Sequence, residues 1–434
     1  MKSNLRDVIK GRVLLPGDED FDEARKPWNS AVDQPVAAVA HAADAEDVAS
    51  LVRHAAQAGL TIATQPSGHG ASGNTDGVIL LRTAALDRVE IDPERRLARV
   101  GAGARWGQVQ GAAGEYGLTG LAGSMPLVSV TGYTLGGGLS WFGRKYGLAS
   151  DAVLAFDVVS ADGVPARVTA DSDQDLFWAL RGGGGDFALV TAVEFALYPE
   201  PELYGGSMMW PDERAPEVFA ALREVVTYAP DELSIWLNRV QFPSAPPMAG
   251  ISTAFLGSAE EGRRLLRRFE EIGGMLSDSR GPLPTAELGS ITNEPTNPSP
   301  GVSRGELLTG LDDEAVAILL AEPIDPLINV QVRQLGGALA RGGEGASGGV
   351  AEPYLLYLLG LAIDPQLSAA SRDKQERLVA ALGERVPGRK PFTFVASGES
   401  AAAAFSAQTL QRLRAIKRAR DPEGVFRSNF PVLG

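Results

Sequence analysis

Short runs of β-branched and other apolar residues alternate with alanine-rich stretches from residue 35 onward, and no other feature constrains the fold as much. The alternation predicts a strand within 35–43, a helix within 44–59 and a strand within 60–66. Asp44 stands where the helix cap is expected, because an aspartate there accepts a hydrogen bond from first-turn N–H groups. A strand, helix, strand order is typical of layers in which helices cover a sheet. The first part of the chain is therefore predicted to be α/β.

The same pattern continues to about residue 200. It predicts a strand at 77–83, a hairpin over 88–103 that turns at Asp92-Pro93, a helix at 106–118, a hairpin over 153–172, and a helix, glycine run and strand over 175–197. Proline and charged residues then cluster at 199–216, where we place a boundary. This clustering is typical of a linker between two packing units.

The second half contains four strand-like runs separated by helical segments. The runs are 232–240, 250–257, 329–337 and 353–363, and the helical segments include 258–273 and 366–383. On the run 232–240, alternation puts Trp236 and Asn238 on the opposite phase to Ile235 and Leu237. We expect a sheet covered by helices. The stretch 281–303, rich in Pro, Ser, Thr and Asn, is predicted to be a long loop, and one interpretation is a lid.

Charge and cysteine content exclude several classes of function. With 54 acidic against 40 basic residues, the net charge of −14 disfavours nucleic acid and anionic membrane surfaces as partners. The chain has no cysteine, which excludes disulfides, thiolate nucleophiles, cysteine zinc sites and iron–sulfur clusters, and we expect no metal. The first residues contain no apolar run of signal-peptide length, and no stretch approaches a membrane span. We expect cytoplasmic localisation.

Glycine clusters mark the candidate binding loops. The cluster 101–107, "GAGARWG", lacks the spacing of a nicotinamide fingerprint and follows a hairpin, so that site is disfavoured. The cluster 181–187, "RGGGGDF", is also consistent with a close-packed turn. The clusters 66–70, "PSGHG", and 132–148 expose backbone N–H groups to a planar or phosphorylated ligand. Two such loops predict a large dinucleotide cofactor bound without the usual motif.

Four collinear segments carry a family resemblance: 66–73, 123–163, 175–191 and 412–426. They resemble the berberine bridge enzyme-like branch of the vanillyl-alcohol oxidase flavoproteins. The resemblance implies an α+β fold, with a PCMH-type FAD-binding domain of two α/β subdomains and a substrate domain whose antiparallel sheet is covered by helices. The domain limits it implies are 32–200 for FAD binding, 201–400 for the substrate domain and 401–434 for a C-terminal segment that returns to the FAD domain.

By the same resemblance, His69 matches a histidine that bonds covalently to the 8α-methyl group of FAD. Met125 stands where many relatives have a cysteine with a second link to the flavin, and its methylated sulfur cannot form that bond. FAD is thus expected to be attached through His69 only. The residues assigned to the cofactor are Ser67, Gly68, His69, Gly70, Ala71, Gly123, Ser124, Met125, Val128, Gly132, Tyr133, Gly136, Gly137, Gly138, Val190 and Asn429. His41 and His54, at helical spacing among alanines, are expected to be surface or packing residues.

The catalytic base is less evident. Relatives often carry a tyrosine where this chain has Phe392 and Phe394, and phenylalanine cannot accept a proton. The candidates are Tyr133, Tyr354, Tyr357 and Glu352, and base-free chemistry is the alternative. Tyr354 and Tyr357 are three apart on a predicted strand, so at most one can face the site. A working phenol needs a lowered pKa, for which Arg144, Lys145 and Arg333 are candidate cations.

The resemblance implies an FAD-linked oxidase that acts on a small organic, secondary-metabolite-type substrate. A hydride would pass to flavin N5 and O2 would take the electrons to give hydrogen peroxide. Val128 matches a residue that leaves O2 room beside the flavin. If Trp236 faces the flavin, an aromatic or polyketide-like substrate suits the site better than a sugar. Two alternatives stay open: a flavoprotein that catalyses a cyclisation without net redox turnover, and a non-catalytic flavin-binding protein.

Overall fold

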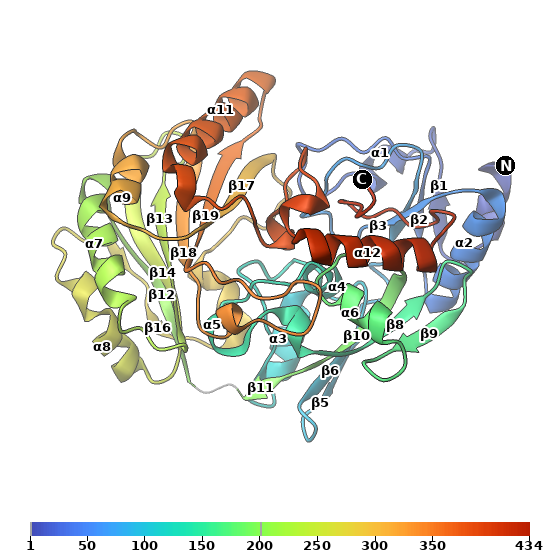
Figure 1. The fold of residues 1–434 in the computed structure, drawn as a ribbon, viewed down its shortest axis with the longest axis horizontal. Helices are drawn as coiled ribbons and strands as arrows, with labels where there is room; N and C mark the ends of the chain where they lie inside the picture. The colour runs from blue at the N-terminus through green and yellow to red at the C-terminus, as the bar shows by residue number, and fades with distance from the viewer. Residues whose placement is uncertain (1, 200–201) are drawn as a thin grey trace.

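The computed structural model describes residues 2–199 and 202–434. The first part of the chain forms a four-stranded, a five-stranded and a two-stranded sheet, and the second forms one larger sheet that packs beside them (Figure 1). This is the α+β architecture that the resemblance implied, including an antiparallel sheet with helices over it. The expected domain limits at 32, 200 and 400 stay a prediction. None of the helices in the described ranges has the length and apolar character needed to cross a membrane.

A four-stranded sheet contains the first strands, in the order β1-β2-β4-β3. Its strands are β1 (Arg12–Leu14), β2 (Ala38–His41), β3 (Ile62–Thr64) and β4 (Ile79–Arg82). β4 pairs in parallel with β2 and β3, while β1 is antiparallel to β2. The helix α2 (Ala45–Ala58) begins after Asp44, whose side chain accepts from the Asp47 N–H, which confirms the predicted cap. His41 corrects the expected helical spacing, because it ends strand β2 and only His54 is helical.

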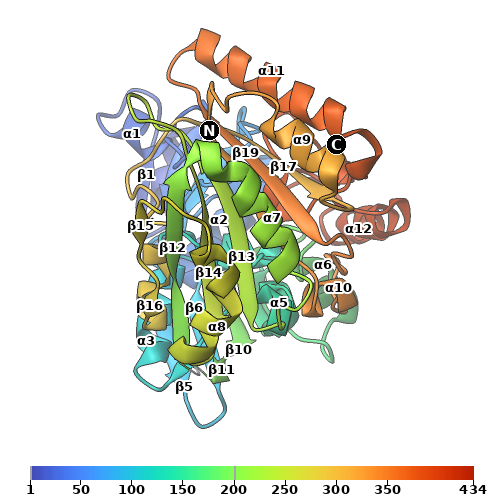
Figure 2. The ribbon, with the colours of Figure 1, turned by 90° about the vertical axis from the view of Figure 1, so that its left-hand side faces the viewer.

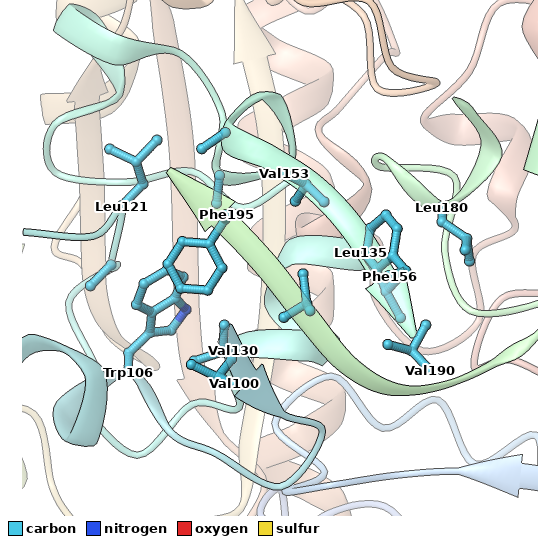
Figure 3. Packing of buried hydrophobic residues seen from close by; sticks show 14 of the residues in the cluster. Val100, Trp106, Leu121, Val130, Leu135, Val153, Phe156, Leu180, Val190 and Phe195 are labelled. Carbon is cyan, nitrogen blue, oxygen red and sulfur yellow. The ribbon is translucent and has the colours of Figure 1, made fainter. Parts of the chain in front are cut away.

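A five-stranded antiparallel sheet follows, in the order β5-β6-β10-β8-β9. Its strands are β5 (Val89–Asp92), β6 (Leu97–Gly101), β8 (Val153–Val159), β9 (Pro165–Val168) and β10 (Leu189–Ala196). Both predicted hairpins are present. The helices α3 (Trp106–Gly114) and α6 (Gln174–Leu180) accompany this sheet. Trp106, Phe156, Val190 and Phe195 belong to the core that joins them (Figure 3).

The large sheet has eight strands, mostly in the order β15-β12-β14-β13-β18-β19-β17, with β16 beside β12. The strands are β12 (Leu203–Pro211), β13 (Leu233–Val240), β14 (Met248–Leu256), β15 (Ser277–Asp278), β16 (Gly281–Pro282), β17 (Gly301–Leu308), β18 (Leu327–Gln334) and β19 (Tyr354–Leu361). One face is covered by α7 (Ala215–Val225), α8 (Ala259–Glu270), α9 (Asp313–Leu320) and α11 (Pro365–Leu382) (Figure 2). We call the opposite face, which packs toward the first part of the chain, the inner face.

Two stretches, one interpreted as a boundary and one predicted to be a long loop, contain regular structure. The boundary at 199–216 contains strand β12, which pairs with β14 along its whole length. Its glycines hid the strand pattern: a Cβ on Gly206 would lie 2.6 Å from the Ser279 carbonyl oxygen. The predicted loop 281–303 includes β16, a 3-10 turn that buries Leu288 and Ile291, and the start of β17. Packing against β12 and α3 therefore orders much of this stretch.

Shorter elements connect these layers. They are α1 (Phe21–Ala24), β7 (Leu118–Thr119), α4 (Val130–Leu135), α5 (Gly143–Tyr146), β11 (Tyr198–Pro199) and α10 (Ala338–Arg341). The C-terminal helix α12 (Ala407–Arg420) contacts α6, and Phe426 forms an isolated bridge with Ile62 of β3. The last residues therefore pack on the first part of the chain (Figure 1).

Candidate active site between the glycine loops and the large sheet

The loop that follows β3, residues 65–73, is termed the histidine loop. Gly68 has a φ of +81°, and a Cβ there would lie 2.8 Å from the Pro27 Cα atom, so only glycine fits. His69 stacks on Trp28, with ring centroids 4.4 Å apart and an interplanar angle of 13°. Its Nδ1 lies 2.9 Å from the Ser67 Oγ. The loop therefore holds the imidazole in one orientation.

The imidazole of His69 is neutral and has one unpaired nitrogen. Burial, followed by the nearby charge of Arg105, lowers the pKa of His69 to about 4. Its Nε2 is buried and has no hydrogen-bond partner within the described part of the chain. A neutral, oriented imidazole with one ring nitrogen not engaged by the protein is what a histidine nucleophile requires.

A buried network behind the histidine loop fixes its position. Arg82 donates to the Gln65 Oε1 at 2.9 Å and to the carbonyl oxygens of Ala24 and Lys26. Gln34 and Gln65 hydrogen-bond each other through their side-chain amides. Burial lowers the pKa of Arg82 to about 10, so it keeps its charge at neutral pH. The segments that contain Trp28 and His69 are thus both hydrogen-bonded to the buried guanidinium of Arg82.

The second glycine cluster surrounds Tyr133 on α4. A Cβ on Gly123 would lie 3.4 Å from the Tyr133 ring, and one on Gly138 would lie 2.5 Å from it. Glycine at 138 therefore makes room for the phenol ring, whereas a side chain at 123 would only contact it. Gly132, by contrast, has no heavy atom within 4 Å of its Cβ position, and neither has Gly70 in the histidine loop. The backbone at these two glycines is open to a ligand.

Other glycines in the clusters are explained by packing within the protein. A Cβ on Gly136 would lie 2.8 Å from the Thr393 Cγ2, and Gly137 faces Ser347. In the run 181–187, a Cβ on Gly182 would meet Ser347 at 2.4 Å and one on Gly184 would meet Phe392 at 2.8 Å. The run 181–187 is therefore a close-packed turn. The assignment of Gly136, Gly137 and Gly138 to the cofactor stays a prediction.

The remaining residues assigned to the cofactor occupy mixed environments. Met125 and Ala71 are buried, and Val128 is half-buried against the main core. Val190 contributes to that core on β10 (Figure 3). The Asn429 carbonyl oxygen accepts from the Ser72 Oγ at 2.6 Å, which joins the C-terminal segment to the histidine loop. Ser124 lies beside Gly289 of the stretch 281–303.

The inner face of the large sheet presents an aromatic stack opposite these loops. Trp236 on β13 stacks on Trp141, with centroids 3.6 Å apart and an angle of 12°. Ile235 and Leu237 point into the helix-covered core, as the alternation predicted. The Arg333 guanidinium carbon lies 3.8 Å from the Trp236 ring centroid. Trp141 had no recognisable signal in the sequence, because its partner is 95 residues away.

A line of polar side chains crosses the same face. Arg333 Nε donates to Gln331 Oε1 at 2.5 Å, and Gln331 Nε2 donates to Asn238 Oδ1 at 2.6 Å. Asn238 Nδ2 in turn donates to Ser252 Oγ at 3.2 Å. Sequence reasoning missed Gln331 and Ser252. The available signal was alternation along the strands. Gln331 lies two positions before Arg333 on β18, and Ser252 alternates with apolar residues of β14.

The structure separates the candidate bases. Tyr357 lies on the inner face, where its ring meets Phe394 edge-on at 5.8 Å. Tyr354 packs against the helix-covered core, so the two tyrosines do lie on opposite faces. Glu352 forms an ion pair with Arg389 at 3.1 Å. The carboxylate is therefore already engaged by a cation.

Neither inner phenol has the lowered pKa that a base needs. Burial raises the pKa of Tyr133 and of Tyr357, and the charge of Arg333 opposes burial only weakly. This corrects the expectation that a neighbouring cation would lower the pKa of a phenol below its ordinary value. Of the three proposed cations, Arg333 acts on both phenols. Arg144 donates to the Leu233 and Leu335 carbonyl oxygens, and Lys145 pairs with Glu232 at 3.4 Å.

Comparisons with known proteins identify an FAD-binding region in the first part of the chain. Residues 36–169 match the family described as FAD binding domain. (R)-6-hydroxynicotine oxidase of Paenarthrobacter nicotinovorans is 27% identical over 466 residues, spanning 98% of this chain and 97% of that protein. The protein is an FAD-dependent oxidoreductase. An FAD-dependent monooxygenase of Fusarium proliferatum is 36% identical over 178 residues, but the match covers 40% of this chain and 34% of that protein.

Solved structures share the fold of this FAD-linked oxidoreductase. Physcomitrella patens BBE-like 1 superposes with a TM-score of 0.87 at 20% identity, over 99% of each chain. Xylooligosaccharide oxidase from Myceliophthora thermophila superposes with a TM-score of 0.85 at 21% identity, over 99% of this chain and 98% of that one. The berberine bridge enzyme-like fold is therefore shown.

The residues present fit FAD. Buried polar atoms without partners in the described residues occur on or next to the loops that the glycines open: His69 Nε2, Thr131 Oγ1, the Tyr133 hydroxyl and Thr134 Oγ1. A buried polar atom without a partner costs free energy, so these atoms require a ligand or water. Gly70 and Gly132 leave the adjoining backbone accessible. A polar dinucleotide supplies partners for such a surface.

Proposed function

We propose that this protein is an FAD-dependent oxidase whose cofactor is attached covalently through His69 alone. The observation that carries the attachment is the unpaired, buried Nε2 of a neutral imidazole. Trp28 and Ser67 hold that ring in place, so little motion is needed before bond formation. A second link through sulfur is excluded because the chain has no cysteine.

We propose an aromatic, secondary-metabolite-type substrate. When bound, FAD accepts a hydride from the substrate, and two electrons then pass to O2 to give hydrogen peroxide. Phe394 and Tyr357 place aromatic rings at the inner face, which suits a planar molecule. Tyr133 and Tyr357 keep their protons at neutral pH and therefore act as hydrogen-bond donors.

The lack of a poised base narrows the reaction type. A substrate whose own nitrogen lone pair promotes hydride loss needs no protein base, because positive charge develops on nitrogen and no proton must leave in the same step. We therefore favour oxidation of a carbon next to a neutral amine nitrogen. The name of one relative, 6-hydroxynicotine oxidase, is consistent with this reaction type.

One experiment tests both parts of the proposal. The yellow holoenzyme is precipitated with acid, and a second sample is photoreduced and mixed with oxygenated buffer while peroxide is measured. We expect the pellet to stay yellow, the flavin to reoxidise and one peroxide to form per flavin. A colourless pellet contradicts the attachment alone. Failure to reoxidise contradicts the oxidase and favours a cyclisation without net redox turnover or a non-catalytic flavin protein.

The role of Val128 in oxygen access is tested separately. We expect Val128→Leu to slow reoxidation by O2 about tenfold, because the added methylene narrows the space that O2 needs beside the flavin. The rate of flavin reduction should change little. Val164→Leu is the matched control, since Val164 is 54% exposed on the surface. Equal reoxidation rates in stopped flow would remove Val128 from the mechanism.

A further inference from the structure

Arg333 is held rigidly on the inner face of the large sheet. It lies on β18 directly opposite Trp236 of β13. Its guanidinium stacks on the Trp236 ring at 3.8 Å, and Trp236 stacks on Trp141 from the first part of the chain. The ring of Phe394 lies 5.3 Å away. A planar cation packed in this way has a fixed position before any ligand arrives.

Most donors of this guanidinium are unused. Among residues 2–199 and 202–434, the one hydrogen-bond partner of Arg333 is the Gln331 side chain, which accepts from Nε, and no carboxylate oxygen lies within ion-pair distance of Arg333. Arg239, on the neighbouring strand but the opposite face, shows the usual arrangement. It binds Asp212 through two nitrogens, at 2.9 and 2.5 Å.

Arg333, unlike Arg239, has no counter-ion among the described residues, and this costs free energy of folding. A partly buried charge without a counter-ion is destabilising, and burial lowers the pKa of Arg333 to about 10. Glu294 acts on Arg333 electrostatically, but it is exposed and forms no ion pair with it. An unpaired cation that is kept at such a cost in a protein of net charge −14 points to an anionic ligand.

The polar line behind Arg333 determines which nitrogens face the ligand. Gln331 accepts from Nε, Asn238 accepts from Gln331, and Ser252 accepts from Asn238. This chain fixes the rotation of the guanidinium plane. Its two terminal nitrogens are then free to donate in parallel, which is the geometry that a carboxylate accepts.

We infer that the substrate carries a carboxylate, which Arg333 binds through its two terminal nitrogens. The inference rests on the proposed function, because it takes the space between the inner face and the FAD loops as the substrate site. Arg333 influences Tyr133 on α4 as well as Tyr357 on β19, so its charge reaches side chains from both parts of the chain. Arg333 thereby selects among flat aromatic molecules by their charge.

The test uses the holoenzyme and two probes of nearly equal shape, benzoate and benzamide. Binding is followed by the change in flavin absorption and checked by calorimetry. We expect benzoate to bind the wild-type protein at least tenfold more tightly than benzamide. Arg333→Gln should weaken benzoate at least tenfold and change benzamide less than threefold. Arg341→Gln, which alters an arginine 66% exposed on α10, is the control and should change neither.

The outcomes separate this inference from the proposed function. Equal affinities of the wild-type protein for benzoate and benzamide would overturn the inference without any variant, so a misfolded Arg333→Gln cannot hide its failure. A shifted flavin reduction potential in Arg333→Gln, with benzoate binding unchanged, would also overturn it by assigning Arg333 to the cofactor. If benzoate is preferred but the reduced flavin does not react with O2, the carboxylate site stands and the oxidase proposal fails.

Discussion

The two walls of the candidate site are built in different ways. The wall from the first part of the chain consists of loops, with glycines that open the backbone and side-chain atoms that lack partners, such as His69 Nε2 and the Tyr133 hydroxyl. The wall from the large sheet consists of side chains on strands, joined to one another from Arg333 to Ser252. The first wall lacks partners that a cofactor supplies. In the second, neighbouring polar side chains bind one another, and the terminal nitrogens of Arg333 and the Asn329 Oδ1 are left without partners among the described residues.

This difference indicates which wall varies with the substrate. Loops that offer backbone groups bind a constant group whatever their side chains, since the N–H is the same in every residue. A pleated face presents one side chain at every second position, so single substitutions change its chemistry without changing the fold. We therefore expect changes in the loops to alter flavin binding and changes on the inner face to alter substrate choice.

The largest effect is expected at the loop wall. His69→Ala removes the only nitrogen that we propose for attachment, so denatured protein should release all of its FAD. The fluorescence of the protein band in a denaturing gel measures this loss. His54→Ala, in helix α2, is the control and should keep the label. A fluorescent His69→Ala band would show that another residue forms the bond.

The next largest effect is expected in the C-terminal segment, which packs against the first part of the chain. Lys417 is buried and binds the carboxylate of Asp421 and the carbonyl oxygens of Asp186 and Phe426. Lys417→Met leaves a buried carboxylate without its cation, so the free energy of unfolding should fall by about 3–5 kcal/mol in a urea titration. Arg420→Gln breaks an exposed pair and should cost less than about 1 kcal/mol. Similar losses in both variants would contradict the distinction.

The charge state of His69 gives a prediction about pH. Its pKa of about 4 lies below the ordinary 6.5, so the imidazole should remain neutral as the pH falls through 6.5 and gain a proton only near 4. Attachment of FAD to apoprotein at pH 5.5 should therefore proceed at nearly the rate found at pH 7.5. An unperturbed imidazole would be about one-tenth neutral at pH 5.5 and correspondingly slower. A tenfold slower attachment would contradict the lowered pKa.

The smallest effect is expected on the inner face. Because burial keeps the Tyr357 phenol protonated, Tyr357→Phe removes a donor and not a base. We expect flavin reduction by substrate to slow about three- to thirtyfold, less than the 100- to 10,000-fold typical of a lost general base. Tyr354→Phe, on the opposite face of the same strand, should leave the rate within twofold. A loss above 100-fold for Tyr357→Phe would restore the phenol as base.

Much of the fold was predictable because it depends on short-range patterns. The alternation in β2, α2 and β3, the cap at Asp44 and both hairpins of the five-stranded sheet follow from residues close together in the sequence. Strand β12 was missed because its glycines pack against the segment near Ser279, more than 70 residues away. His41 lies at the end of β2, within the strand predicted at 35–43, so the helical spacing noted for His41 and His54 does not reflect a shared helix.

The sequence by itself determined the loop wall: the glycines of the histidine loop, the position of His69 and the absence of any cysteine are local facts of the chain. Only the tertiary structure decided the inner face. It brought Trp141 against Trp236, aligned Arg333 with Gln331, Asn238 and Ser252, and left Arg333 without a carboxylate. It also raised the pKa of Tyr133 and Tyr357, because a pKa depends on burial and on neighbouring charges, and both are set by residues distant in the sequence.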